Sequence, residues 1–334
     1  MENIRIGFKK NKIVSGPNNF LNRLKYEFSK KNGISAVNNI NFFKDISIYN
    51  SVSRFSLFKP YILRLDQLYY DSNNESANKL LNQKIFKSIE KADGVIYQSE
   101  WAKKLYDTQF KPIKKPHCII RNGIEIPNKP AIDEKINNLK KEKLIIACSA
   151  NWRNHKRLDG IINVIIELNK QLYCELIVIG EVNKKRKDLP YIKYLGNIKS
   201  YEVIKNLNKA HIFIHLSWLE ACPNSVVEAV GNYVPTICNN VGGTREVIEV
   251  TNGGLISECD DEALLDNLLY RKKTLDLESP PKIDYKVVID DIFKLINNYE
   301  YYFNLIVTTN IDIVNISNKY LDFINKVLDK KKLR

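Results

Sequence analysis

The chain has 334 residues, which is too long for one small hydrophobic core and corresponds to roughly two domains of about 150 residues each. Hydrophobic residues make up 44% of the chain and charged residues 27%, with 13 Gly and 11 Pro, so the composition excludes a disordered or fibrous protein. We therefore expect a globular protein that is larger than a lone binding module.

The charge is strongly basic, because 52 Lys and Arg residues against 38 Asp and Glu residues leave a formal net charge of +14. Such a balance favours an anionic partner: a nucleic acid, an acidic membrane surface or a phosphorylated substrate. The joint abundance of Lys, Asn, Ile and Tyr is also what an AT-rich genome produces, so mutational bias is an alternative source of part of the charge. A nucleic-acid binder should cluster Lys with stacking aromatic residues, whereas here Lys is dispersed. We expect no nucleic-acid partner, and we retain a peripheral contact with an anionic membrane.

The six cysteines are scattered, with no Cys-x-x-Cys pair and no His at metal-ligand spacing. This pattern indicates reduced thiols in a cytoplasmic protein. The first residues contain no long apolar segment, and no other stretch approaches the roughly 18 apolar residues of a membrane span. The sequence therefore predicts a protein that is neither secreted nor integral to a membrane.

Short β-rich runs alternate with longer helical runs, a pattern typical of parallel sheets with helices on both faces. In the first half, the predicted strands are 4–8, 61–66, 94–99 and 118–121. Helical periodicity is clearest over 74–91 and 100–110. The pattern breaks at 127–130, and the polar stretch 131–143 follows. We place the domain boundary there, with a first domain over 1–130 and a second over 141–310.

The same alternation restarts after this boundary. The predicted strands are 144–149, 175–180, 211–216, 236–239 and 255–257. The predicted helices are 158–172, 201–209, 225–231, 244–249 and 261–271, followed by two closing helices over 284–304 and 311–330. Two similar α/β domains in tandem predict a ligand in a cleft between them, at the carboxyl ends of the strands.

Two glutamates border the carboxyl end of the strand 211–216. Glu220 lies in the loop after the strand, and we expect Glu228 in the first turn of the next helix. The free N–H groups of that helix N-terminus can meet phosphate oxygens, while carboxylates accept hydrogen bonds from sugar and ribose hydroxyls. This combination suits a nucleotide sugar. Ser225 and Glu228 also match a Ser-x-x-Glu capping box, which is the purely structural alternative.

The wider sequence resembles retaining nucleotide-sugar glycosyltransferases of family 4, or group 1, whose hallmark is two Glu residues in the spacing of Glu220 and Glu228. The resemblance continues through 229–237 and 241–246, and it also takes in 119–125, 176–181 and 194–197. It covers about residues 90–260 well and the first 90 only faintly. It implies an α/β protein of the GT-B fold, in which two Rossmann-like domains face each other across a cleft.

The resemblance implies a role for each glutamate: Glu220 should contact hydroxyls of the donor sugar, and Glu228 the ribose. In the turn of Gly242 and Gly243, backbone can approach the donor without an intervening Cβ, and an ordinary loop is the alternative. The remaining donor-binding candidates are backbone positions at the helix N-terminus and after the strand 175–180. They are Asn224, Ser225, Val226 and Gly180.

Family members place an Arg and a Lys after the first strand of the second domain, where both neutralise the diphosphate leaving group. Lys156 matches the Lys, whereas Ala150 or Asn151 occupies the usual Arg position, so Arg153 would have to substitute from elsewhere in the loop. A cation is required because bond cleavage adds negative charge to the β-phosphate. The simpler interpretation of Arg157 is a solvated charge at the start of a helix.

Two residues of the first domain complete the candidate site. Gly16 is what this chain keeps of a Gly pair that many relatives have beside the donor phosphates, and a plain turn is the alternative. Asp66 stands where many relatives have a His near the reacting carbon. It could orient an acceptor or sugar hydroxyl, with a helix cap or a salt bridge to Arg64 as the alternative. We interpret His211 and His215 as core residues.

Asp-x-Asp, the metal signature of the other main glycosyltransferase fold, does not occur in the chain. We therefore expect no metal and no cofactor beyond the nucleotide-diphosphate sugar, which acts as co-substrate. The predicted function is retaining transfer of a hexose-type sugar to a glycan, lipid-linked or protein acceptor. A catalytically inactive nucleotide-sugar-binding relative is the alternative, because the displaced Arg is a change that decay would produce. The resemblance also implies that the closing helix, within 311–334, packs back on the first domain.

Overall fold

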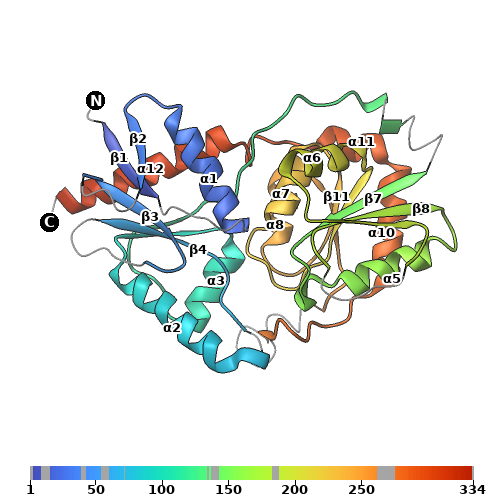
Figure 1. Cartoon of the computed structure of the whole chain (residues 1–334), viewed down its shortest axis with the longest axis horizontal. Coiled ribbons are helices and arrows are strands. Elements are labelled where there is room, and N and C mark those ends of the chain that lie inside the picture. Colours follow the sequence, from blue (N-terminus) through green and yellow to red (C-terminus); the bar gives the residue numbers. More distant parts are fainter. Residues whose placement is uncertain are drawn as a thin grey trace. The chain divides into compact units, whose positions relative to one another are not determined.

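The computed structural model describes residues 3–8, 16–38, 43–53, 60–70, 72–133, 135–136, 143–182, 188–261 and 275–332. The chain folds as two compact units (Figure 1). Unit 1 comprises Met1–Glu125 together with Ile311–Arg334, and unit 2 comprises Ile126–Asn310. Each unit contains one six-stranded parallel sheet. None of the helices in the described ranges is both long enough and apolar enough to cross a bilayer.

The sheet of unit 1 has the strand order β2-β1-β3-β4-β5-β6. Its strands are β1 (Ile4–Phe8), β2 (Ile34–Asn38), β3 (Ile46–Asn50), β4 (Tyr61–Leu65), β5 (Gly94–Tyr97) and β6 (His117–Ile119). Its helices are α1 (Gly16–Ser29), the 3₁₀ turn η1 (Ser72–Asn74), α2 (Glu75–Lys91), α3 (Glu100–Gln109) and α12 (Ile313–Lys332). The strand β4 is buried along its whole length, as expected for a central strand covered on both faces.

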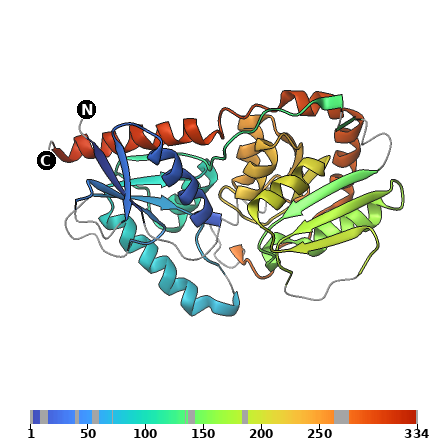
Figure 2. The ribbon, with the colours of Figure 1, turned by 45° about the horizontal axis from the view of Figure 1, so that its top comes forward.

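The last helix, α12, packs on unit 1 although it follows unit 2 in the sequence. Figure 2 shows it, in red, running alongside the strands of this unit. Phe20 of α1 and Tyr320 of α12 place their ring centroids 6.0 Å apart. Gly94 opens β5 where a Cβ would come within 2.7 Å of Val327, so the helix packs directly on the strand. Residues from both ends of the chain thus share one hydrophobic core.

The sheet of unit 2 has the order β12-β11-β10-β7-β8-β9. Its strands are β7 (Leu144–Ser149), β8 (Cys174–Ile179), β9 (Ile192–Gly196), β10 (Ile212–His215), β11 (Thr236–Asn239) and β12 (Gly254–Ser257). Its helices are the 3₁₀ turn η2 (Asn154–Lys156), α5 (Leu158–Leu168), α6 (Ser200–Lys209), α7 (Asn224–Gly231), α8 (Thr244–Thr251), α10 (Tyr285–Asn297) and α11 (Tyr299–Leu305). The strands β10 and β11 are completely buried, as expected for strands that lie inside the sheet and are covered on both faces.

The structure departs from the sequence-based elements in several places. The strands β2, β3 and β9 were not predicted. The predicted closing helix over 284–304 is broken at Asn298, which separates α10 from α11 with φ −126° and ψ 34°. All but the first residue of the helix predicted over 261–271 lies outside the described residues, as do residues 9–15 before α1.

Candidate active site

The candidate residues of unit 2 all follow carboxyl ends of its parallel strands. The loop with Lys156 follows β7, Gly180 follows β8, Glu220 follows β10, and the turn of Gly242 and Gly243 follows β11. Because the sheet is parallel, these ends lie along one edge. The structure therefore brings residues that are far apart in the sequence to one edge of the sheet, where open α/β sheets bind ligands.

Glu220 is the centre of this arrangement and is about nine-tenths buried. Lys156 Nζ forms an ion pair with Glu220 Oε1. His215 Nε2 lies 3.2 Å from Glu220 Oε2, within hydrogen-bond distance. His155 Nε2 is 4.0 Å from Oε1, which is too far for a hydrogen bond. One buried carboxylate is therefore surrounded by three nitrogen-bearing side chains, of which two make direct contact.

Burial changes the protonation of these basic groups. Desolvation, aided by the charge of Arg153, lowers the pKa of Lys156 to about 7, while its contact with Glu220 favours the charged ammonium. Desolvation, with Lys156 and Arg153, lowers the pKa of His155 to about 3. The pKa of His215 lies well below its usual value, first because of burial and then because of Lys156 and His155. Both histidines are therefore neutral at pH 7.

The backbone around Glu220 is held by the glycine turn after β11. Gly243 N donates to Glu220 O at 2.7 Å. Gly242 has φ +81°, and a Cβ there would lie 3.0 Å from Glu220 O and 3.1 Å from Glu220 N. Leu219, just before Glu220, also has a positive φ of 54°. Only glycine fits position 242 without strain, so this turn fixes the loop that carries Glu220.

Arg157 holds in place the loop that carries Arg153 and Lys156. The interpretation of Arg157 as a solvated charge is therefore wrong. Arg157 is buried, with φ 53°, and its guanidinium donates to both oxygens of Asp260 at 2.9 and 2.8 Å. It also lies over the Trp218 ring, 5.0 Å from the centroid, and Trp218 N donates to His155 O at 2.7 Å. Arg157 therefore ties η2 to the loop of Glu220. Arg153, in contrast, is exposed and close enough to Lys156 to lower its pKa.

Glu228 lies one residue further into α7 than expected, which places it just past the first turn. The helix begins at Asn224 after an N-cap at Pro223, so Glu228 is its fifth residue and not part of its first turn. The capping box of Ser225 and Glu228 does not form, because Ser225 is already inside the helix. No side chain caps α7 in the part of the chain that is described. Glu228 is half-buried, as are Asn224 and Ser225, whereas Val226 is buried.

Close packing against Ala150 requires a glycine at position 180. Its φ is +106°, and a Cβ would come within 1.9 Å of Ala150 O. Its N–H donates to Gly196 O at 2.8 Å, and Ala150 N donates to Ile179 O at 3.2 Å. The glycine thus lets the ends of β7, β8 and β9 meet at the same edge as Glu220.

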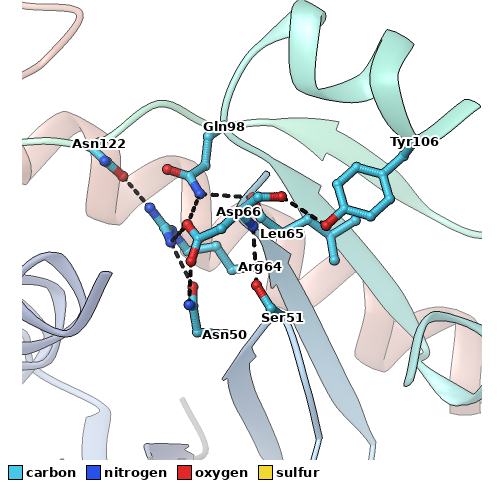
Figure 3. Close-up of polar contacts among 8 residues, drawn as sticks. All are labelled: Asn50, Ser51, Arg64, Leu65, Asp66, Gln98, Tyr106 and Asn122. Atoms are coloured by element: carbon cyan, nitrogen blue, oxygen red, sulfur yellow. Dashed lines mark hydrogen bonds and ion pairs between the residues drawn. The ribbon is translucent and has the colours of Figure 1, made fainter. Parts of the chain in front are cut away.

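Asp66 lies in unit 1, directly after β4, at the centre of a polar network (Figure 3). Its Oδ1 accepts from Arg64 Nη1 at 3.1 Å and from Gln98 Nε2, and its Oδ2 accepts from Asn50 Nδ2 at 2.5 Å. Tyr106 OH donates to the backbone oxygen of Asp66 at 2.8 Å. The salt bridge to Arg64, considered as an alternative, is therefore present.

The Arg64 side chain is fully buried and is shared between several partners. Nη1 also donates to Asn50 Oδ1 at 2.7 Å, and Nη2 donates to Asn122 Oδ1 (Figure 3). The guanidinium lies over the ring of Phe20, 4.6 Å from its centroid. Asp66 keeps 19% side-chain exposure, so one face of a rigidly held carboxylate remains accessible. Gly16, the other candidate of unit 1, is the first residue of α1.

His155 and His215 are site residues that the sequence did not indicate. His215 ends an apolar strand, which favours a core residue, and it is indeed buried. However, its ring nitrogen points to Glu220, five residues further along the chain. The signal that could have found it is that His215 is the last residue of its strand, where a side chain meets the loop. His211, four residues earlier, behaves as predicted: its Nδ1 accepts from the backbone N–H of Ile145 at 3.0 Å.

No group of three or more His, Cys, Asp or Glu residues suited to hold a metal ion occurs within the described ranges. The six cysteines are all free thiols, five of them buried.

Two Rossmann-like units, each with a six-stranded parallel sheet, define a protein of the GT-B fold. Residues 130–273 match the family described as glycosyl transferases group 1. This match confirms the resemblance to group 1 glycosyltransferases, and the matched residues lie within unit 2. The chain therefore has the GT-B fold, and its match to the group 1 family covers somewhat less than half of its length. No curated protein matches the chain in sequence.

Solved structures similar to this chain share its fold at low sequence identity. Sucrose-phosphate synthase from Thermosynechococcus elongatus has a TM-score of 0.70 at 10% identity, over 99% of this chain and 100% of that one. HepE of Anabaena, solved with UDP-glucose, has a TM-score of 0.65 at 13% identity, over 97% and 99%. A glycosyltransferase from Rickettsia africae has a TM-score of 0.57 at 15% identity, over 98% and 99%.

Proposed function

We propose that this chain transfers a sugar from a nucleotide-diphosphate sugar to an acceptor hydroxyl, with retention of anomeric configuration and without a metal ion. The observation that carries the proposal is the ion pair of Lys156 and Glu220 at the strand-end edge of unit 2, within the residues that match the group 1 family. This pair keeps a cation and a hydrogen-bond acceptor for hydroxyls together in a largely buried position. A diphosphate needs the cation, and a sugar needs the acceptor for its hydroxyls.

The donor would occupy the edge defined by α7, η2 and the glycine turn. Glu228 would accept from ribose hydroxyls, and the N–H groups of Asn224, Ser225 and Val226 would meet phosphate oxygens at a helix N-terminus. The backbone at Gly180, Gly242 and Gly243 would allow the donor a close approach, and Gly16 would serve the same purpose in unit 1.

In the reaction, the bond between the anomeric carbon and the β-phosphate oxygen breaks, and the diphosphate keeps the electron pair. Lys156, with Arg153, stabilises that charge, which is the contribution a metal ion would otherwise make. The acceptor oxygen bonds to the anomeric carbon from the same face, and its proton passes to the departing phosphate oxygen. Glu220 holds the donor sugar, and Asp66 orients an acceptor or sugar hydroxyl.

The substrates can be described by class. The donor is a UDP-, GDP- or ADP-linked hexose, and the acceptor is a glycan, lipid-linked or protein hydroxyl. We further propose a cytoplasmic enzyme with a peripheral contact to an anionic membrane; the free thiols support a reducing compartment, and the net charge of +14 supports the contact.

The test is a panel of UDP-glucose, GDP-mannose and ADP-glucose with the free nucleotides, measured in EDTA by thermal shift and by release of nucleoside diphosphate. A ligand at 100 times its dissociation constant stabilises by about 2.7 kcal/mol. We expect one nucleotide series to stabilise the chain and its sugar to be released. Stabilisation without turnover would indicate an inactive nucleotide-sugar-binding relative. No stabilisation by any member would contradict both.

A further inference from the structure

The His215 side chain contacts Oε2 of Glu220, the carboxylate oxygen that does not pair with Lys156. His215 is the last residue of β10, its side chain is 3% exposed, and its Nε2 lies 3.2 Å from Glu220 Oε2. The acceptor is a carboxylate, so this nitrogen must carry the hydrogen. Because the imidazole is neutral at pH 7, it has one N–H, and the contact therefore selects the Nε2–H tautomer.

The two oxygens of Glu220 have different partners. Oε1 contacts Lys156, and Oε2 faces His215. If Lys156 turns to the diphosphate when a donor binds, Oε1 loses its cation and becomes available to a sugar hydroxyl. Oε2 keeps its hydrogen bond throughout. The carboxylate would then present one defined oxygen to the donor.

We infer that His215 is a positioning residue for Glu220, donating a hydrogen bond from Nε2 to Oε2 so that the ionised carboxylate keeps its orientation when Lys156 leaves. This inference rests on the proposed function of Lys156 and Glu220. A neutral donor suits the role, since it supports the carboxylate without adding a second cation that would compete for the diphosphate. A buried carboxylate with no donor would instead favour its protonated form, which accepts hydrogen bonds poorly.

The first arm of the test needs no substrate. The chain has four histidines, so ¹⁵N-histidine NMR of the full chain can resolve each ring. His211 is an internal reference, because its Nδ1 accepts from a backbone N–H and it must also be the Nε2–H tautomer. We expect His215 to be neutral and Nε2-protonated at pH 7, with a ring signal that moves in Glu220→Ala while that of His211 does not. An Nδ1–H or charged His215 would overturn the inference.

The second arm compares His215→Leu with His215→Gln, since the Gln amide can replace the donor. The readouts are kcat for release of UDP, GDP or ADP from the active panel sugar and the calorimetric Kd of that free nucleotide. Loss of a hydrogen bond to a charged group corresponds to about 10- to 150-fold. We expect a fall of this size in kcat for His215→Leu, a nucleotide Kd within about threefold, and recovery of most of kcat in His215→Gln.

A merely structural role for His215 would change the nucleotide Kd and kcat together and would not be rescued by Gln. That result would overturn the inference, as would full activity of His215→Leu. If the wild type released no nucleotide from any panel sugar, the proposed function itself would fall and the inference with it. The NMR arm would still show whether the hydrogen bond exists, so the two failures are distinguishable.

Discussion

The substitution Arg157→Ala should destabilise unit 2 strongly, whereas Arg153→Ala, four residues earlier in the same loop, should not. Arg157 forms a bidentate pair with Asp260, and the two side chains are only 4% and 1% exposed. Removing the guanidinium leaves the Asp260 carboxylate buried with Asn239 Nδ2, at 2.9 Å, as a remaining donor. A buried charge that has lost its counter-ion is the main cost.

Breaking a buried ion pair by removing one partner costs about 3–5 kcal/mol. For a domain of about 150–250 residues, each kcal/mol lowers Tm by roughly 2–4 °C, so we expect a decrease of about 6–20 °C in the unfolding of unit 2. Arg153 is exposed, so we expect Arg153→Ala to change the free energy of unfolding by no more than about 0.5 kcal/mol.

The assay is urea unfolding of the full chain, followed by circular dichroism, with calorimetry to separate transitions of the two units. A double variant, Arg157→Met with Asp260→Leu, should be less destabilised than the sum of its single variants, because neither charge is left buried alone. If the free energy of unfolding of Arg157→Ala lay within about 0.5 kcal/mol of the wild-type value, the reasoning about this pair would be refuted.

Three further predictions concern charged and titratable residues of unit 2. Glu228→Ala should weaken nucleotide binding in calorimetry, while Glu220→Ala should mainly lower kcat, since the first is assigned to ribose and the second to sugar. Lys156→Ala should lower kcat by about 100- to 1000-fold, and wild-type kcat/KM should fall as the pH rises through about 7, because the free chain then loses the charged ammonium. Unfolding should become easier below pH 6.5, by at most about 1.4 kcal/mol per pH unit for each buried histidine, because the unfolded chain binds protons there that the folded chain does not.

Each of these predictions has a control variant or an outcome that would contradict it. Unchanged nucleotide affinity in Glu228→Ala would contradict its role, and Arg153→Ala should share the direction of the Lys156→Ala effect on kcat. His211→Gln should reduce the pH dependence of unfolding, since it removes one group whose pKa falls to about 4 in the folded chain. Stability that does not change between pH 7 and pH 5 would show that the histidines are accessible to protons.

The sequence predicted the strands of unit 2 well where they are continuous apolar runs. The run over 144–149 became β7 with the same bounds, because a strand covered on both faces needs apolar residues throughout. The strands β2 and β9 were missed because they lie at sheet edges. There, polar residues such as Ser35, which is partly exposed, and Lys193, which is exposed, interrupt the apolar pattern. The strand β3 was missed because Ser47 and Tyr49 interrupt its apolar run, although both are buried.

The spacing of Glu220 and Glu228 indicated the resemblance to group 1 glycosyltransferases, but it did not show what surrounds either carboxylate. Contacts between Glu220 and His215 depend on how a loop returns to the end of its own strand, and this return is set by the positive φ of Leu219 and Gly242. Such backbone conformations leave little trace in a sequence. Likewise, Arg157 is buried against Asp260, which lies about a hundred residues away in the sequence. No local sequence pattern could indicate that pairing.

The measurement that tests the central claim most directly follows the anomeric proton of the transferred or released sugar by ¹H NMR. The full chain is incubated in EDTA with the nucleotide sugar that stabilises it, and the first product is observed before mutarotation. We predict that an α-linked donor yields an α product, that Glu220→Ala slows this release, and that Mg²⁺ does not increase the rate. A β product, or turnover that requires a divalent ion, would contradict this prediction.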